Sequence, residues 1–357
     1  MTDSPSLAEV VAIGDFEAVA RARMNRAAFD YVAGGAGEEI TLAENVAAWR
    51  RRILRPRVLV DVRAIDTATT FLGDAVTLPL AIAPMASHGL AHPEAEVATA
   101  RAAAAAGVPF TLSTMSTRSI EEVARAAPDA IRWFQLYVQL DPEWGRSLIS
   151  RAVGSGYRAI VLTADLPVVG IRRRDRRNGF TLDVSLGNFP RRTDPDRPAS
   201  SYQALGSQRH AGLVWDDIAR IRDSSGLPLI LKGILEVDDA VRAVRAGADA
   251  IVVSNHGARQ LDRVAAGIDV VEEIATAVGG RAEVYVDGGV RNGADVAIAL
   301  ALGARGVLIG RPAFWALAAG GEAGVARLLE LAREDFAATL ALLGTRRVPD
   351  IGRSHVR

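Results

Sequence analysis

Eight short apolar runs recur along the chain, and helical stretches lie between them. Each run is continuous and rich in aliphatic and β-branched side chains, as buried parallel strands are. The runs cover residues 80–84, 108–112, 133–137, 159–163, 229–232, 250–254, 284–287 and 306–310. The stretches with helical spacing cover residues 93–106, 119–126, 142–153, 236–246, 268–278 and 292–302. Strands and helices that alternate eight times over about 250 residues predict an α/β fold, a (β/α)8 TIM barrel. A doubly wound open sheet is the main alternative, but it rarely uses eight evenly spaced units.

Two parts of the chain depart from this repeat. Residues 1–75 precede the first strand, and segments 7–24 and 38–51 have the pattern of helices that cap the barrel. We expect this N-terminal helical cap to belong to the same domain as the barrel of residues 76–357. About 65 residues separate the fourth strand from the fifth. Within this long loop, residues 181–212 are rich in Pro, Arg, Ser and Gly, which predicts a lid over the active-site face.

Charge and cysteine content exclude several classes of protein. The 357 residues include 42 basic and 42 acidic side chains, so the net charge is zero. Such a chain lacks the excess of Lys and Arg on which non-specific nucleic-acid binding depends. The absence of cysteine excludes disulfides, iron–sulfur clusters and thiol nucleophiles. No carboxylate cluster joins His88 and His92, so we expect no metal site. No signal sequence or membrane span is visible, which predicts a cytoplasmic protein that binds neither membranes nor nucleic acid.

Polar side chains follow most of the predicted strands. In a barrel of this kind, chemistry is placed in the loops at the carboxyl ends of the strands. A structural role is the default for any one of these residues, but polar ends on successive strands of one barrel predict a catalytic rim. In strand order, the residues are Pro84–Ala86, Ser113, Gln135, Tyr137, Thr163, Asp165, Lys232, Ser254–Arg259, Asp287–Arg291, Gly310 and Arg311.

The loops after the seventh and eighth strands combine glycine with arginine. Gly288 and Gly289 precede Arg291, and Gly310 precedes Arg311. Glycine turns expose backbone N–H groups to a phosphate, and arginine binds phosphate through paired hydrogen bonds. This is the usual phosphate pocket of the fold, so we expect a phosphate-bearing cofactor. A Rossmann dinucleotide site and a serine hydrolase are not indicated, because their glycine motifs are absent.

His256 and Arg259 lie three residues apart after the sixth strand. Histidine is the natural base near neutral pH, and arginine suits a planar carboxylate. Asp165 could orient the imidazole and stabilise its charged form. The alternative is a histidine that caps a strand beside a surface arginine. The basic run 172–177 reads mainly as a solvated or intersubunit stretch, although one of its arginines could reach the pocket.

The segment 254–262, Ser-Asn-His-Gly-Ala-Arg-Gln-Leu-Asp, resembles the active-site signature of the FMN-dependent 2-hydroxy acid oxidase and dehydrogenase family. The likeness continues, in order and with the expected spacing, through segments 29–36, 134–137, 162–165, 231–233, 286–291 and 309–312. It spans nearly the whole chain except residues 181–212. The loop after the first strand is closer to the lactate oxidases of this family than to its plant glycolate oxidases.

This resemblance implies roles for the residues of the rim. His256 would take a proton from the substrate, and Asp165 would support its imidazolium. Arg259 and Arg172 would hold the substrate carboxylate with help from Tyr31, and Tyr137 would hydrogen-bond the substrate oxygen. Lys232 would lie near flavin N1 and favour the anionic reduced flavin. FMN itself would contact Pro84, Met85, Ala86, Ser113, Gln135, Thr163 and Ser254, and its phosphate Asp287, Gly288, Gly289, Arg291, Gly310 and Arg311.

The resemblance also implies an activity and leaves alternatives open. Ala86 stands where family oxidases tend to have Ala and dehydrogenases Gly, which favours an oxidase that forms hydrogen peroxide from O2. A dehydrogenase that uses a quinone or another acceptor is the alternative, and a barrel that only binds FMN is a third.

Met115 replaces a Trp of glycolate oxidases, so we expect it in a reshaped substrate pocket that admits lactate, glycolate or mandelate-type acids. Family members form tetramers or octamers, so we expect a homotetramer. Hydride and proton transfer from the substrate carbon both stay open.

Overall fold

The computed structural model describes residues 7–182, 184–189 and 210–357. Within these ranges, eight parallel strands close into a barrel in the order β10-β3-β4-β5-β6-β7-β8-β9. Every apolar run predicted as a strand forms one, and the TIM barrel is confirmed. The strands are β3 Leu80–Met85, β4 Phe110–Ser113, β5 Arg132–Leu136, β6 Ala159–Thr163, β7 Leu229–Ile234, β8 Ala250–Val253, β9 Glu283–Asp287 and β10 Gly306–Ile309.

The interior of the barrel is packed with side chains and closed at the amino ends of its strands. A buried cluster there includes Trp133 of β5, Tyr285 of β9 and Leu308 of β10. A short hairpin, β1 Thr69–Phe71 and β2 Asp74–Val76, was not predicted and inserts Phe71 against Tyr285 with ring centroids 4.9 Å apart. This plug fills one end of the barrel, so a ligand has room at the carboxyl ends of the strands.

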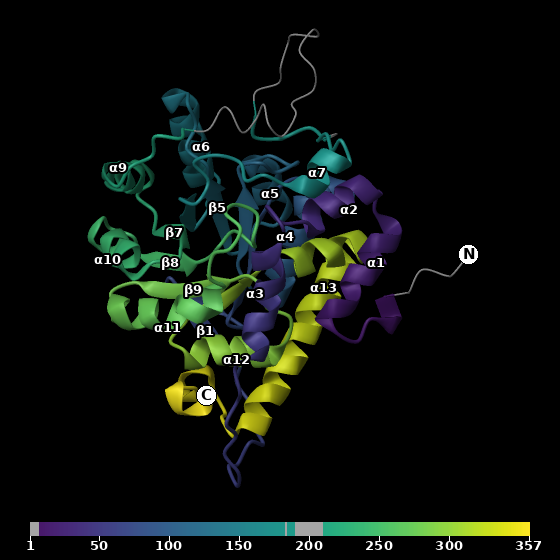
Figure 1. Ribbon diagram of the computed structural model, residues 1–357, viewed down its shortest axis with the longest axis vertical. Helices are drawn as coiled ribbons and strands as arrows, with labels where there is room; N and C mark the ends of the chain where they lie inside the picture. Colours follow the sequence, from purple (N-terminus) through teal and green to yellow (C-terminus); the bar gives the residue numbers. More distant parts are fainter. Residues whose placement is uncertain (1–6, 183, 190–209) are drawn as a thin grey trace.

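Helices surround the barrel, and those predicted from the sequence are found (Figure 1). Ser119 and Asn292 begin two of them with capping boxes, which satisfy the first backbone N–H groups. Two helices, over residues 216–225 and 311–343, were not predicted, and Gly320 and Gly321 interrupt the second with non-helical dihedral angles. The helices are α4 Glu96–Ala106, α5 Ile120–Ala126, α6 Pro142–Gly154, α9 Asp216–Ser225, α10 Val237–Arg245, α11 Gly267–Val278, α12 Gly293–Ala301 and α13 Arg311–Leu343.

The N-terminal cap is helical but divided differently from the prediction. The expected helix over 7–24 is broken, because the Asp15 carboxylate accepts the backbone N–H groups of Val11 and Ala12 and makes a turn there. A second helix follows it after the N-cap residue Asn25, and the third begins at Ile40 rather than at residue 38. The cap comprises η1 Leu7–Glu9, η2 Ile13–Asp15, α1 Phe16–Arg23, α2 Arg26–Ala33 and α3 Ile40–Arg50.

The long loop between β6 and β7 carries a short helix, α7 Arg173–Arg177, which lies beside α2 (Figure 1). Residues 183 and 190–209 of the predicted lid 181–212 lie outside the described residues. Two short 3₁₀ segments, η4 Val348–Asp350 and η5 Arg353–His355, end the chain, and η3 His88–Leu90 follows β3. Among the helices of the described ranges, none is long and apolar enough to cross a membrane.

Candidate active site

A cavity at the carboxyl ends of the strands brings together most of the predicted site residues. It encloses about 920 Å³ between its lining atoms, including the part open to solvent. The predicted residues that line it are Tyr31, Pro84, Met85, Ala86, Ser113, Tyr137, Lys232, His256, Arg259, Asp287, Gly288, Gly289, Arg291, Gly310 and Arg311.

His256 and Asp165 form a buried pair at the mouth of the barrel. The His256 Nδ1 atom lies 2.8 Å from Asp165 Oδ1, and the Tyr137 hydroxyl lies 3.4 Å from His256 Nε2. An acidic partner on Nδ1 fixes the proton there and leaves Nε2 as the acceptor that faces the cavity. Gly233 makes the pairing feasible, since a Cβ at this residue would lie 2.6 Å from Asp165 Cβ. The predicted His–Asp arrangement is therefore present, with Nε2 ready to accept a proton.

Burial and charge set the protonation of this pair in the expected direction. Burial lowers the pKa of His256 below its usual range, and the opposing charge of Asp165 only partly offsets this effect. Burial raises the pKa of Asp165, but the neighbouring His256 and Lys232 outweigh it and lower that pKa overall. At neutral pH, the pair is therefore an ionised carboxylate beside a neutral imidazole, which is the state a general base requires.

The loop that carries His256 is strained and held by an unpredicted contact with the cap. His256 and Ala258 both have positive φ angles, of 59° and 63°, which non-glycine residues seldom adopt. The Asn255 side chain accepts a hydrogen bond from the Ala258 backbone at 3.0 Å. Asn45 of α3 pairs with it through two amide hydrogen bonds of 2.9 and 2.6 Å. Asn45 and Asn255 thus fix the loop, and nothing in the spacing of the sequence could have paired them.

The residues expected to hold a carboxylate gather around Tyr31. The guanidinium carbon of Arg259 lies 4.9 Å from the centroid of the Tyr31 ring, and that of Arg172 lies 5.8 Å from it. Arg259 also donates a 2.7 Å hydrogen bond to the Tyr31 carbonyl at the end of α2. Arg172 is 4% exposed and precedes α7 as its N-cap residue. It is the arginine of the basic run that approaches the site, although it is not among the residues lining the cavity.

Three arginines that line the cavity, together with the nearby Arg172, give it a strong positive charge. Burial, together with Arg259, Arg291 and Arg172, lowers the pKa of Arg311 to about 9, so this guanidinium stays charged at neutral pH. Arg311 donates hydrogen bonds to the backbone oxygens of Val32, Gly34 and Gly257. Its neighbours repel it, and an anion in the cavity would relieve that repulsion. The cluster suits two anionic groups, the phosphate of a cofactor and the carboxylate of a substrate.

The remaining lining fits the sugar and phosphate parts of a flavin mononucleotide. Asp287 is buried, and within the described residues its Oδ1 atom has no hydrogen-bond partner. A buried carboxylate oxygen of this kind is costly unless a ligand donates to it, as a hydroxyl would. Gly288 and Gly289 follow with φ angles of 88° and 92° and turn the backbone beside it. These residues therefore fit a cofactor with hydroxyl and phosphate groups.

Three residues predicted to contact the flavin, Gln135, Thr163 and Ser254, lie outside the cavity lining and support it through hydrogen bonds. Gln135 donates to Thr163 Oγ1 at 3.0 Å and accepts from Ser113 at 3.1 Å. Ser254 accepts hydrogen bonds from the Lys232 ammonium at 2.8 Å and from the His256 backbone at 3.0 Å. The predicted flavin contacts of Gln135, Thr163 and Ser254 stay predictions.

Met115, which was predicted to lie in the substrate pocket, is not among the residues that line the cavity. It is 1% exposed and packs with Tyr137, Leu166 and Leu182 in a buried apolar cluster, against which Ala86 also packs. The cluster forms the wall behind two lining residues. A direct contact between Met115 and the substrate stays a prediction.

Lys232 and Asp287, which both line the cavity, form a buried ion pair. Their Nζ and Oδ2 atoms lie 3.3 Å apart, and the two side chains are 5% and 9% exposed. Removing one partner of a buried pair leaves the other charge unpaired, so Lys232→Met should lower the free energy of unfolding by about 3 kcal/mol. Urea unfolding of the FMN-free protein measures this. Adding Asp287→Asn should recover part of the loss, whereas strictly additive losses would contradict the coupling.

Comparison with known proteins agrees with this site. The profile of the family described as FMN-dependent dehydrogenase matches residues 20–357. The L-lactate oxidase of Nostoc sp. is 48% identical over 350 residues, covering 95% of this chain and 96% of that protein. The glycolate oxidase of Spinacia oleracea is 46% identical, covering 98% and 96%. A crystal structure of mandelate oxidase with (S)-4-hydroxymandelic acid superposes with a TM-score of 0.91 at 43% identity, covering 98% of both chains. The chain therefore belongs to the FMN-dependent dehydrogenase family.

Proposed function

We propose that this protein uses FMN to oxidise a small (S)-2-hydroxy acid to the 2-oxo acid and passes the electrons to O2, which forms hydrogen peroxide. One observation carries the proposal: the neutral base His256 and the cationic Arg259 line the same cavity as the phosphate-binding arginines. A hydroxy acid needs a base for its proton and a cation for its carboxylate. Both stand beside a site that fits FMN.

Each residue of the site has a distinct task in this proposal. Arg259, with Arg172, holds the carboxylate of the acid and orients its hydroxyl group. Tyr137 donates a hydrogen bond toward the substrate oxygen, and His256 Nε2 accepts a proton. Asp165 stabilises the imidazolium that results. FMN, held by Lys232, Asp287, Arg291 and Arg311, supplies the electron sink that these side chains lack.

The oxidase assignment has support from the relatives and from Ala86. The relatives reported above are named L-lactate, glycolate and mandelate oxidases, and each aligns over at least 95% of this chain. Ala86, at the position where family oxidases tend to have Ala and dehydrogenases Gly, lines the cavity. We therefore propose O2 as the electron acceptor and an acid of the lactate, glycolate or mandelate type as the substrate.

Anaerobic mixing tests the proposed reaction. The purified yellow protein is mixed with L- and D-lactate, glycolate, mandelate and 4-hydroxymandelate, and the flavin band near ~450 nm is followed. Bleaching by one enantiomer, with rapid recovery in air and peroxide formation, is the expected result. Bleaching with slow recovery in air would identify a dehydrogenase. A flavin that no hydroxy acid bleaches would overturn the proposal.

We also propose that the protein is a homotetramer, or an octamer built from it. Val58 and Leu59 are 82% and 103% exposed, and the Arg57 backbone beside them bonds Leu343 next to Leu342, which is 79% exposed. Adjacent exposed apolar side chains of this kind suit a contact between subunits. Light scattering should give four or eight chains for the wild type and fewer for Leu59→Asp, and a wild-type monomer would contradict the proposal. The location in the cytoplasm stays a prediction, which cell fractionation tests.

We propose further that the helical cap, residues 1–75, belongs to the same domain as the barrel. Trp49 of α3 donates a 2.8 Å hydrogen bond to the Gly288 carbonyl in the phosphate loop. Together with the Asn45–Asn255 pair, this contact ties the cap to two loops of the site. These contacts between the cap and the loops of the site support a single domain.

A further inference from the structure

The two elements around the substrate carboxylate come from different parts of the chain. Tyr31 belongs to α2 of the cap, whereas Arg172 precedes α7 in the long loop after β6. Helix α7 has only five residues, which is too short for its own hydrogen bonds to stabilise it. The position of Arg172 therefore depends on contacts that dock α7 against the cap.

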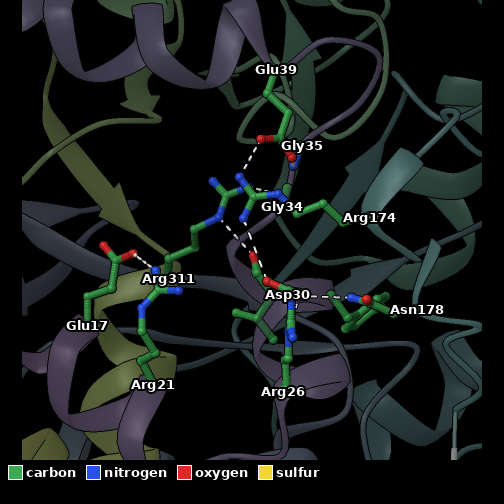
Figure 2. Close-up of polar contacts among 12 residues, drawn as sticks. Glu17, Arg21, Arg26, Asp30, Gly34, Gly35, Glu39, Arg174, Asn178 and Arg311 are labelled. Atoms are coloured by element: carbon green, nitrogen blue, oxygen red, sulfur yellow. Dashed lines mark hydrogen bonds and ion pairs between the residues drawn. The ribbon is translucent and has the colours of Figure 1, made fainter. Parts of the chain in front are cut away.

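Arg174 makes the central contact of this docking (Figure 2). Its guanidinium reaches from α7 to the carboxylate of Glu39, to which it is hydrogen-bonded, and lies 3.9 Å from Asp30 Oδ1. Asn178, just after α7, donates a 2.8 Å hydrogen bond to the other oxygen of Asp30. The side chains of Arg174, Glu39 and Asp30 are 35%, 22% and 17% exposed, so these pairs are less screened than those on an open surface.

Glu39 and Gly34 show that the cap is shaped to receive this side chain. The second oxygen of Glu39 accepts the backbone N–H of Gly35 at 3.0 Å, which fixes the carboxylate beside the end of α2. A Cβ at Gly34 would lie 3.3 Å from Arg174 Cδ and 2.7 Å from the Asp30 carbonyl oxygen. Glycine at this position leaves room for the arginine to cross.

The docking also arranges the aromatic wall beside the carboxylate. Phe180 follows α7 and stacks on Tyr31 with centroids 4.3 Å apart and planes 10° from parallel. The backbone N–H of Phe180 donates to the Asp175 carbonyl of α7 at 2.9 Å, so the ring moves with the helix. Tyr31 thus contacts Phe180 as well as the guanidinium groups of Arg172 and Arg259.

The ion pairs of Arg174 with Asp30 and Glu39, called the latch below, counter the positive charge around the site. Helix α7 carries four arginines and only one acidic residue, Asp175, and Arg172 precedes it, while Arg259 and Arg311 line the cavity. Like charges repel at this range, and the repulsion is strongest before an anion enters. Asp30 and Glu39 offset it from the side away from the cavity. They hold α7 in the binding position before the substrate arrives.

We propose that Arg174, through Asp30 and Glu39, is a positioning residue that docks α7 on α2 and so preorganises Arg172 and Tyr31 to capture the substrate carboxylate. The proposal rests on the proposed function, because it assigns the carboxylate of the hydroxy acid to Arg172 and Tyr31. Arg174 acts through Arg172 and does not itself line the cavity.

The test compares three variants of the FMN-loaded protein. Arg174→Met removes the latch, Arg174→Lys keeps the charge, and Arg177→Met makes the same change at an exposed position of the same helix. For Arg174→Met, we expect kcat/KM to fall about tenfold, which corresponds to ~1.4 kcal/mol. The fall should come from KM, with the limiting rate of flavin reduction within about twofold of wild type. Arg174→Lys should recover part of the loss, and Arg177→Met should resemble wild type.

A neutral substrate separates positioning from general damage. The amide of the same hydroxy acid has no carboxylate, so its kcat/KM should not change in Arg174→Met. An equal loss for acid and amide, or a KM unchanged from Arg177→Met, would overturn the proposal. If Arg174→Met does not fold, Glu39→Gln keeps the shape of the latch without its charge and must show the same selective loss.

A binding measurement separates this inference from the proposed function. The 2-oxo acid of the same series is titrated into each variant, and its affinity is read from the change in flavin absorbance. Weaker binding in Arg174→Met than in Arg177→Met, with Arg174→Lys between them, supports the latch even if no hydroxy acid reduces the wild-type flavin. Equal affinities in all three variants would overturn the latch while leaving the reaction intact.

Discussion

His256→Ala should leave a yellow protein whose flavin is reduced by the hydroxy acid about 10²–10⁴-fold more slowly than in the wild type. The imidazole is the neutral base in the cavity, held by Asp165 at 2.8 Å with its Nε2 toward Tyr137. Removing it takes away the proton acceptor while the arginines that hold the phosphate stay in place. Flavin content should therefore change little.

Stopped-flow reduction under anaerobic conditions measures this effect. His210→Ala is the matched control, because His210 is exposed and its backbone N–H, which the substitution keeps, donates a 2.9 Å hydrogen bond to the Val138 carbonyl. An unchanged rate of reduction in His256→Ala would show that another group is the base. A colourless variant would instead show that the His256 loop is needed to hold FMN.

The pH dependence of the wild type should follow from the same pair. Burial lowers the pKa of His256 below 6.5, so the base is neutral at pH 7 and becomes protonated only in more acidic solution. The rate of flavin reduction should therefore stay constant from neutral pH down to the usual histidine range and fall below it. Single-turnover rates between pH 5 and 8 check this, and a fall that begins above pH 7 would contradict it.

The sequence predicts the barrel and its rim well because both depend on local patterns. A buried parallel strand is a continuous apolar run, and closure of the barrel places all strand ends on one rim. His256, Asp165 and Lys232 could be grouped for that reason. Helix α13 was missed because two glycines interrupt its apolar pattern. Helix α2 was missed because the segment before it, residues 7–24, was predicted as one long helix.

The contacts that hold the rim in place carry no such signal. Asn45 pairs with Asn255, and Arg174 with Glu39, across 210 and 135 positions of the sequence. An asparagine on a helix or an arginine in a basic run has the same local pattern whether it is solvated or paired. Such partners depend on how the cap sits on the barrel, which the three-dimensional structure supplies.

Gly289→Ala should destabilise the protein far more than a glycine substitution elsewhere. Gly289 has a φ of 92°, and a Cβ there would overlap the Asn45 carbonyl, lying 2.6 Å from its carbon and 2.8 Å from Trp49 Cδ1. Backbone of α3 cannot yield as a flexible side chain would, so the helix must shift away from the phosphate loop. We expect a loss of about 4 kcal/mol in the free energy of unfolding, at the upper end for single substitutions.

Gly280→Ala is the matched control for this change. Gly280 also has a positive φ, of 74°, but a Cβ there would meet no atom within 4 Å. Its substitution should cost only the left-handed backbone strain, about 1–2 kcal/mol. Urea unfolding and retention of FMN measure both variants.

The same measurements test whether the cap and the barrel form one domain, because the extra cost of Gly289→Ala arises where α3 contacts the barrel. A single cooperative transition at lower urea and a loss of FMN would support one domain. Two outcomes would contradict a single domain. One is a loss of stability in Gly289→Ala no larger than in Gly280→Ala, and the other is a separate unfolding transition of the cap while FMN stays bound.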